Sequence, residues 1–245
     1  KIPALDLVTW NRFDLAFKLC YLDLYEKNRE CAEKIYYQDI RSQTLSSFAE
    51  FGNDVKNHFD RYKKDFFQIY KSIREEGFEE NKSIVPLSEQ KTILNGAHRV
   101  AAAIHLNKAV TVVDTGLPAM NCDYNYFFQR NVPVNILDQV AVTFIEYSQN
   151  TYVAFLWPSS KSQRKKAESH IPNVVYRKEI TLNANGGFNL LVQTYKGMDW
   201  VGTIENNYKG IKAKLLECFP NFNPVTIIAF QAESIEYVRE IKEKI

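Results

Sequence analysis

The segment from Ile84 to Val113 constrains the fold more than any other part of this chain, because its apolar spacing changes twice within a few positions. Ile84–Leu87 and Thr92–Leu94 are short apolar or β-branched runs on either side of a polar four-residue turn. This pattern predicts a β-hairpin. Asn95 and Gly96 then end the second strand.

Beyond Gly96 the apolar residues recur at intervals of one helical turn. These positions are Ala97, Val100, Ala101 and Ile104. They predict an amphipathic helix from Ala97 to about Asn107. The apolar run Val110–Val113 follows and predicts another strand.

The start of this predicted helix is a candidate anion-binding corner. His98 and Arg99 lie off the apolar stripe, in the first turn, where unpaired backbone N–H groups and the positive end of the helix dipole favour an anion. Gly96 allows the backbone to approach a ligand closely. We therefore expect Asn95, Gly96, His98 and Arg99 to bind phosphate. The alternative is a structural role, in which the same residues only cap a surface helix.

The order of motifs around this corner resembles a known family. The motifs are Ser72-Ile73, Gly77, Ile84-Val85-Pro86 and Asn95-Gly96-Ala97-His98-Arg99, followed by the alanine-rich helix and the 110–113 strand. Together they resemble the core of the ParB/sulfiredoxin superfamily over residues of about 68–115. The resemblance implies a mixed α/β (α+β) fold with a nucleotide-binding core, whose Gly-x-x-Arg corner binds nucleotide phosphates.

The branches of that family differ inside the corner. Sulfiredoxins carry a reactive cysteine where this chain has Ala97, and the chromosome-partitioning branch has Gly-Glu-Arg-Arg, whose middle pair is replaced here by Ala97 and His98. The free serine kinase branch has Asp-Gly-x-His-Arg. The present corner is most similar to that branch and departs from it only at Asn95, which replaces the aspartate.

The function that this resemblance implies is a nucleotide-dependent kinase. It would transfer a phosphoryl group to a small hydroxylated metabolite or a sugar-like acceptor, with ATP, ADP or CTP and Mg²⁺ bound at the corner. Two alternatives remain open. One is a nucleotide-sensing, ParB-like binding module that contacts DNA or protein. The other is a non-catalytic domain of a larger biosynthetic enzyme.

Phosphoryl transfer also needs a group that orients the acceptor hydroxyl, which is often a carboxylate. The candidates are Asp14 and, beside Gly77, Glu76 or its neighbour Glu75. A structural alternative exists for each: Asp14 and Lys18 have the i, i+4 spacing of a helical ion pair, and the glutamates have the position of a solvated helix end. Lys18 and Lys212 are secondary candidates for anion binding.

Composition narrows the class of partner. The chain has 245 residues, and its 31 basic and 29 acidic side chains nearly cancel. This balance favours a small-molecule partner over nucleic acid. Four dispersed cysteines lack metal-site spacing and fit reduced thiols in a cytoplasmic protein. No apolar run is long enough to cross a membrane. The chain starts at Lys1 and ends inside a predicted helix, which fits a piece of a longer polypeptide.

Helical patterns surround the corner. Residues 10–37 predict one helix packed on the core, and residues 42–74 predict a second helical region that ends at Gly77. A third helix is predicted over 136–148. We expect residues 1–158 to form one domain that contains the corner.

A second, smaller α/β domain is expected over residues 171–245. The strand 151–157 ends at Pro158, and the polar, basic stretch 159–170 is interpreted as a solvated loop at the domain boundary. The elements expected beyond it are strands at 174–182 and 225–230, a turn at 183–187, and helices at 209–219 and 234–245.

Overall fold

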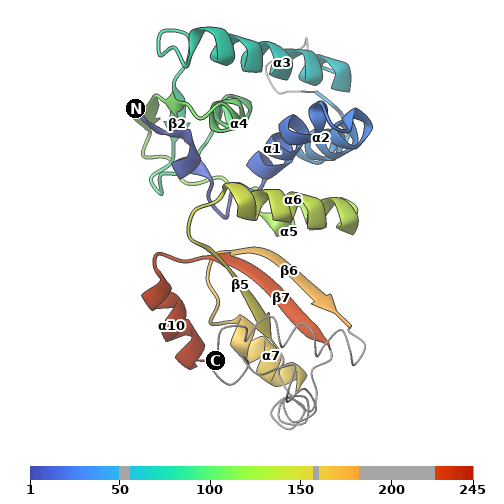
Figure 1. Ribbon diagram of the computed structural model, residues 1–245, viewed down its shortest axis with the longest axis vertical. Coiled ribbons are helices and arrows are strands. Elements are labelled where there is room, and N and C mark those ends of the chain that lie inside the picture. Colours follow the sequence, from blue (N-terminus) through green and yellow to red (C-terminus); the bar gives the residue numbers. More distant parts are fainter. Residues whose placement is uncertain (50–55, 157–159, 182–223, 245) are drawn as a thin grey trace, which may run out of the picture. The chain divides into compact units, whose positions relative to one another are not determined.

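The computed structural model describes residues 1–49, 56–156, 160–181 and 224–244, and it has a mixed α/β fold (Figure 1). The chain divides into two compact units, Lys1–Thr151 and Tyr152–Ile245. The elements of the first unit are β1 (Ile2–Pro3), η1 (Ala4–Leu7), α1 (Asp14–Tyr25), α2 (Arg29–Gln43), α3 (Phe59–Glu76), β2 (Val85–Leu87), α4 (Ala97–His105), β3 (Ala109–Val110), β4 (Val112–Asp114), α5 (Tyr124–Phe128) and α6 (Val134–Tyr147).

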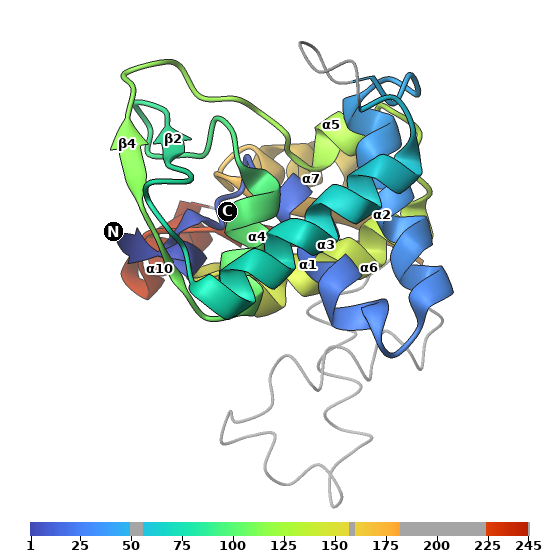
Figure 2. The same cartoon turned by 90° about the horizontal axis from the view of Figure 1, so that it is seen from above.

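Helix α1 lies at the centre of the first unit and packs against α2, α4 and α6 (Figure 2). Its sequence is apolar on almost every side, and Leu15, Phe17 and Leu19 are completely buried. Helix α3 covers α4. A helix that is apolar all round must be surrounded by other elements, which is why α1 forms the core on which the Asn95–Arg99 corner is built.

The expectation of one helix over residues 10–37 is wrong, because the chain forms two. Helix α1 ends at Tyr25, and the side chain of Asn28 accepts a hydrogen bond from the backbone N–H of Cys31 at 3.1 Å, which caps the start of α2. Helix α3 begins at Phe59, later than the predicted 42. It ends at Gly77, whose φ of 81° confirms the predicted glycine cap.

The elements of the corner agree with the pattern in the sequence. After β2 the chain turns, Leu87 pairs with Ile93 in an antiparallel bridge, and the N–H of Ser88 donates to the carbonyl of Thr92 at 2.8 Å. Helix α4 follows, two residues shorter than predicted. Strand β4 then returns to pair with β2 in parallel. The predicted helix is therefore confirmed. The predicted strand 92–94 forms only the isolated bridge at Ile93, and the predicted strand 110–113 is divided between β3 and β4.

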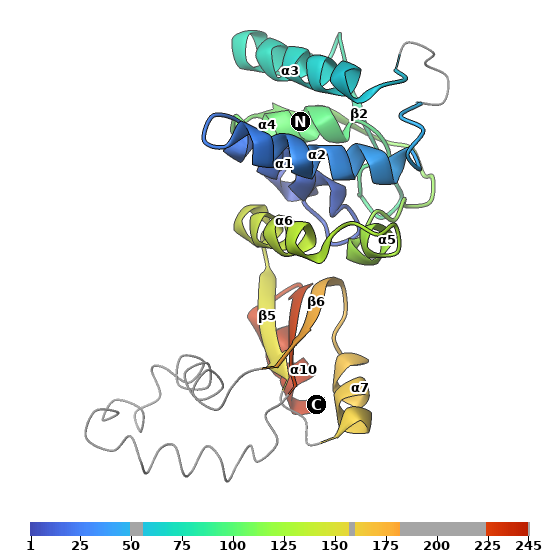
Figure 3. The ribbon, with the colours of Figure 1, turned by 90° about the vertical axis from the view of Figure 1, so that its right-hand side faces the viewer.

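The second unit contains a three-stranded sheet with the order β5-β7-β6 (Figure 3). Its elements are β5 (Thr151–Leu156), α7 (Lys161–Glu168), β6 (Val174–Ile180), β7 (Val225–Gln231) and α10 (Ile235–Lys244). Ala167 of α7 and Ile241 of α10 share one buried cluster with Ile228 and Phe230 of β7. Strands β6 and β7 and helix α10 are confirmed at nearly their predicted bounds.

The boundary between the units differs from the expected one. Strand β5 is a neighbour of β7 in the sheet, so it belongs to the second unit, and the division falls between Thr151 and Tyr152. The stretch expected to be a solvated loop contains α7, which Ser160 caps by accepting from the N–H of Gln163 at 3.3 Å. The expected turn at 183–187, the expected helix at 209–219 and Lys212 lie outside the described residues.

Within the part of the chain that the structure describes, no helix combines the length and the apolar character that a membrane crossing requires. The expectation of no membrane-spanning helix is confirmed to that extent.

Candidate functional site

The corner is built on Gly96, which precedes the first residue of α4. Its φ of 92° lies in the left-handed region, which side chains larger than hydrogen rarely adopt. A Cβ atom at this position would lie 2.7 Å from Nη2 of Arg99. The N-cap Gly96 provides no side-chain hydrogen bond to the first turn of α4, whose backbone N–H groups have no intrahelical partner. Glycine is therefore required for both the turn and the approach of Arg99.

Replacing this glycine tests both requirements. We expect Gly96→Ala to lower the free energy of unfolding by about 1–2 kcal/mol, because of the positive φ, and also to displace the Arg99 guanidinium. The matched control is Gly116→Ala, since Gly116 has a φ of 68° but a Cβ atom there would meet nothing within 4 Å. Urea unfolding should show a similar loss for both variants, whereas only Gly96→Ala should weaken nucleotide binding. Equal binding by both variants would contradict this role of Gly96.

A cavity of about 430 Å³ opens at the start of α4, and residues Asn95–Arg99 all line it. Three more cationic side chains, Arg12, Lys18 and Lys56, contribute to the lining, with the polar Gln43. None of the described residues that line this cavity is an aspartate or glutamate. A cavity with several cations and exposed helix-start amides is suited to an anion.

Two of these cations belong to a buried ion network beneath the cavity. Arg12 donates to both carboxylate oxygens of Asp14 at 2.8 Å, and Lys18 Nζ lies 2.7 Å from Asp39 Oδ2 and 3.4 Å from Asp14 Oδ2. The side chains of all four are at most 4% exposed. Gln43 also donates to Asp39, at 2.5 Å.

The network favours the charged forms of Asp14 and Lys18 despite their burial, whereas burial raises the pKa of Asp39 against the opposing effect of Lys18. Burial alone would raise the pKa of Asp14, but Arg12 and Lys18 outweigh that effect and hold the pKa far below its usual value. Burial likewise opposes the charged form of Lys18, but Asp39 and Asp14 raise its pKa. Two cations balance two anions, so this network adds almost no net charge to the site.

Asp14 therefore has a structural position, which corrects its assignment as a catalytic carboxylate. Both of its oxygens are occupied by Arg12 and Lys18, it is completely buried, and it is not among the residues that line the cavity. The alternative i, i+4 ion pair with Lys18 is the one that forms. Lys18 itself lines the cavity, but its ammonium is paired with Asp39 and Asp14, and its role in anion binding stays a prediction.

Glu76 is also not at the corner. It is the last residue of α3, it is exposed, and it pairs with Lys82 at 2.7 Å and accepts from Ser72 at 3.0 Å. Glu75 is exposed on the same turn. Neither glutamate lines the cavity, so the alternative of a solvated helix end describes both residues.

His98 reaches the cavity from the first turn of α4 and is fixed from behind. Its Nε2 atom lies 2.8 Å from the hydroxyl of Tyr36, which α2 provides, and its ring lies edge-on to Phe66 with centroids 4.9 Å apart. Burial, reinforced by Lys18 and Lys56, lowers the pKa of His98 well below its usual value; Arg99 acts in the same direction, and Asp14 opposes it. The imidazole is therefore neutral at pH 7 in the free protein.

This lowered pKa predicts a loss of stability in mild acid. Below about pH 6.5 the unfolded chain binds a proton at His98 that the folded protein does not bind, so the free energy of unfolding falls as the pH decreases. We expect His98→Gln to remove this part of the dependence, which cannot exceed about 1.4 kcal/mol per pH unit. Urea unfolding of the parent protein and of His98→Gln between pH 7.5 and 5 measures this pH dependence of the free energy of unfolding. Identical pH profiles would contradict the assignment.

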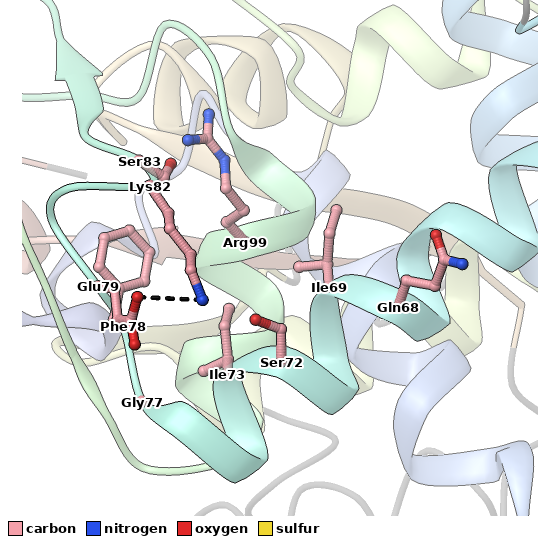
Figure 4. Close-up of a pocket in the computed structure, with 10 residues that line it drawn as sticks. All are labelled: Gln68, Ile69, Ser72, Ile73, Gly77, Phe78, Glu79, Lys82, Ser83 and Arg99. Atoms are coloured by element: carbon pink, nitrogen blue, oxygen red, sulfur yellow. Dashed lines mark ion pairs between the residues drawn. The ribbon is translucent and has the colours of Figure 1, made fainter.

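Arg99 lies between the corner cavity and a second cavity of about 300 Å³, because it lines both (Figure 4). The second cavity has apolar walls from Ile69, Ile73 and Phe78, with Gln68 and Ser72 as polar groups of α3. At one end Lys82 pairs with Glu79 at 3.1 Å. The Arg99 guanidinium is half-buried, which lowers its pKa, and donates to the carbonyl of Ile84 at 3.4 Å.

Several residues of the site were not identified from the sequence. Arg12, Lys56, Gln43 and Tyr36 reach the site from other segments, and no local motif marks them. Lys18 was identified, and its position inside the apolar run of α1 is a signal that it is buried and paired.

The lining residues do not suit a magnesium ion held by the protein alone. Mg²⁺ in nucleotide sites is usually bound by one or two carboxylates together with substrate phosphates. No carboxylate is among the described lining residues, and among those residues no group of three histidines, cysteines or acids could hold a metal. Asn95 offers a side-chain oxygen at the corner, but that Oδ1 accepts from the N–H of Gly96 at 2.6 Å.

Comparisons with known proteins give no relative. No protein-family model matches this chain, and no curated protein and no solved structure matches it significantly.

Proposed function

We propose that this chain binds the phosphates of a nucleotide at Asn95–Arg99 and transfers a phosphoryl group to a small hydroxylated acceptor. The observation that carries the proposal is the combination at the start of α4. Residues Asn95–Arg99, at a helix start without a side-chain cap, line a cavity together with Lys56, and no carboxylate is among its described lining residues. Such a cavity favours a polyphosphate.

The pair of cavities supports transfer rather than binding alone. A phosphotransferase must hold a donor and an acceptor on opposite sides of the transferred group. The cavity lined by Ile69, Ile73 and Phe78 is apolar enough for a nucleoside, and the corner cavity is polar enough for its phosphates together with a small acceptor. Arg99 lines both. The similarity of the corner to the free serine kinase branch supports the same function.

A nucleotide-sensing module is the second candidate. The observation in its favour is that neither Asp14 nor Glu76 lines the corner cavity, so the carboxylate that often orients an acceptor is not found among the described lining residues. A sensor needs the phosphate site but no such group.

The decisive measurement separates binding from transfer. Thermal unfolding with ATP, ADP, CTP and GTP, each with and without Mg²⁺, shows which nucleotide binds, since a ligand at 100 times its Kd stabilises by about 2.7 kcal/mol. Release of ADP with L-serine, glycerol or ribose as acceptor then tests transfer. Stabilisation without transfer would favour the sensor. No stabilisation by any nucleotide would reject both candidates.

A further inference from the structure

The hydroxyl of Tyr36 makes two contacts from a completely buried position. It lies 2.8 Å from Nε2 of His98 and 3.4 Å from the backbone carbonyl of Tyr62. A phenol has one proton to donate, whereas a neutral imidazole carries its proton on either Nδ1 or Nε2. The position of the Tyr36 proton therefore decides which ring nitrogen of His98 is protonated.

Only one arrangement satisfies both contacts. If Tyr36 donates to the carbonyl of Tyr62, then Nε2–H of His98 donates to Tyr36, and both hydrogen bonds form. If Tyr36 donates to Nε2 instead, no proton is left for the carbonyl contact. The Tyr62 carbonyl lies within α3, whose backbone also supplies it with a donor. The first arrangement is favoured because it forms two hydrogen bonds at the Tyr36 hydroxyl, whereas the second forms one. It leaves Nδ1 of His98 without a proton.

Nδ1 is also the ring nitrogen available to a ligand. Nε2 is bonded to Tyr36, which is not among the residues that line the corner cavity, whereas His98 is. The Tyr36 ring is held by a stacked contact with Tyr21, at a centroid distance of 4.7 Å, and by a tilted contact with Phe66 at 5.6 Å. The orientation of the imidazole is therefore set by the core of the first unit.

We propose that Tyr36 fixes His98 as a hydrogen-bond acceptor through Nδ1, so that His98 receives the hydroxyl of the acceptor substrate rather than a phosphate oxygen. This inference rests on the proposed function. An unprotonated nitrogen repels a phosphate oxygen but accepts from a hydroxyl. His98 thus supplies the proton-accepting group that Asp14 and Glu76 cannot supply, and Tyr36 is a positioning residue.

The transfer step balances with these groups. The acceptor O–H bond breaks and its proton moves to Nδ1 of His98, while the acceptor oxygen bonds to the terminal phosphorus of the nucleoside triphosphate. The bond from that phosphorus to the bridging oxygen breaks, and the nucleoside diphosphate leaves. The imidazolium then returns its proton to water. Phosphate charge in the cavity offsets the influence of Lys18 and Lys56, which makes His98 more basic when the donor is bound.

The tautomer is measured directly by nitrogen NMR of the full chain labelled with ¹⁵N-histidine. We expect the proton of His98 on Nε2 in the parent protein, and a mixture of both tautomers in Tyr36→Phe, which keeps the ring but removes the hydroxyl. The matched control is Tyr70→Phe, because the Tyr70 hydroxyl bonds Nδ1 of His105 at 3.1 Å, and neither residue lines the cavity. This control should leave His98 unchanged. A parent protein protonated at Nδ1 of His98 would overturn the proposal.

A second measurement tests the role toward the substrate, with MgATP as donor and water as acceptor. His98→Gln should bind MgATP as the parent does, whereas Arg99→Ala should bind it about 10- to 100-fold more weakly. His98→Gln should lower ATP hydrolysis by about 10²–10⁴-fold, as expected for loss of a general base. Loss of MgATP binding in His98→Gln equal to that in Arg99→Ala would show that His98 holds phosphate, and would reject the inference. If the parent neither binds nor hydrolyses MgATP, the proposed function fails. The NMR measurement of the His98 tautomer still tests whether Tyr36 positions the imidazole.

Discussion

Lys18→Met should lower the free energy of unfolding by about 3–5 kcal/mol, the usual cost of removing one partner of a buried ion pair. Methionine keeps the length of the side chain but removes the ammonium. Among the described residues, Asp39 then retains the hydrogen bond from Gln43, and Asp14 retains Arg12. Urea unfolding followed by far-UV circular dichroism measures the loss.

Two further variants show whether the charge is responsible. Lys34→Met removes a lysine of the exposed i, i+4 pair with Glu30 and should change stability by less than about 0.5 kcal/mol. Asp39→Leu combined with Lys18→Met removes both charges and should recover part of the loss, with a coupling energy of about 0.5–3 kcal/mol. A Lys18→Met protein as stable as the parent would mean that the network does not exist as described.

Arg99→Ala should raise the Kd for MgATP by about 10- to 100-fold, because hydrogen bonds to charged groups contribute about 1.5–3 kcal/mol. The fold should survive, since the hydrogen bond of Arg99 to Ile84 is long and exposed. Isothermal titration and nucleotide-dependent thermal shifts measure the change. Arg99→Lys keeps the charge without the planar guanidinium and should give an intermediate affinity.

The control for this substitution is Arg74→Ala. Arg74 is exposed on the last turn of α3 and lines neither cavity, so its removal changes the net charge equally without touching the site. It should bind MgATP as the parent does. If Arg99→Ala binds ATP, ADP and CTP with unchanged affinity, the corner is not a phosphate site.

The corner could be predicted from the sequence because its signals are local. A change of hydrophobic period, a turn and Gly96 all fall within 30 residues, and each acts through its immediate neighbours. The break between α1 and α2 was missed because Asn28 is a cap surrounded by helix-forming residues. Helix α7 was missed because only Ala167 on it is buried, which leaves no apolar stripe to detect.

The chemistry around the corner could not be predicted in the same way, because it depends on tertiary contacts. Lys18 and Asp39 are 21 residues apart, and Tyr36 and His98 are 62 residues apart. The spacing of Asp14 suggested either catalysis or an ion pair, and only its burial distinguishes the two. Local patterns identify which residue types are present, but not which atoms remain accessible.

If the two cavities hold donor and acceptor as proposed, the position of Arg99, which lines both cavities together with Ile69, has a kinetic consequence. One guanidinium cannot contact ligands in both cavities with the same geometry. A ligand in one cavity would therefore change the shape of the other cavity. Donor and acceptor should therefore bind interdependently, in a preferred order. Release of the two products would be coupled in the same way. The rotamer of the Arg99 side chain would then influence the rate of turnover.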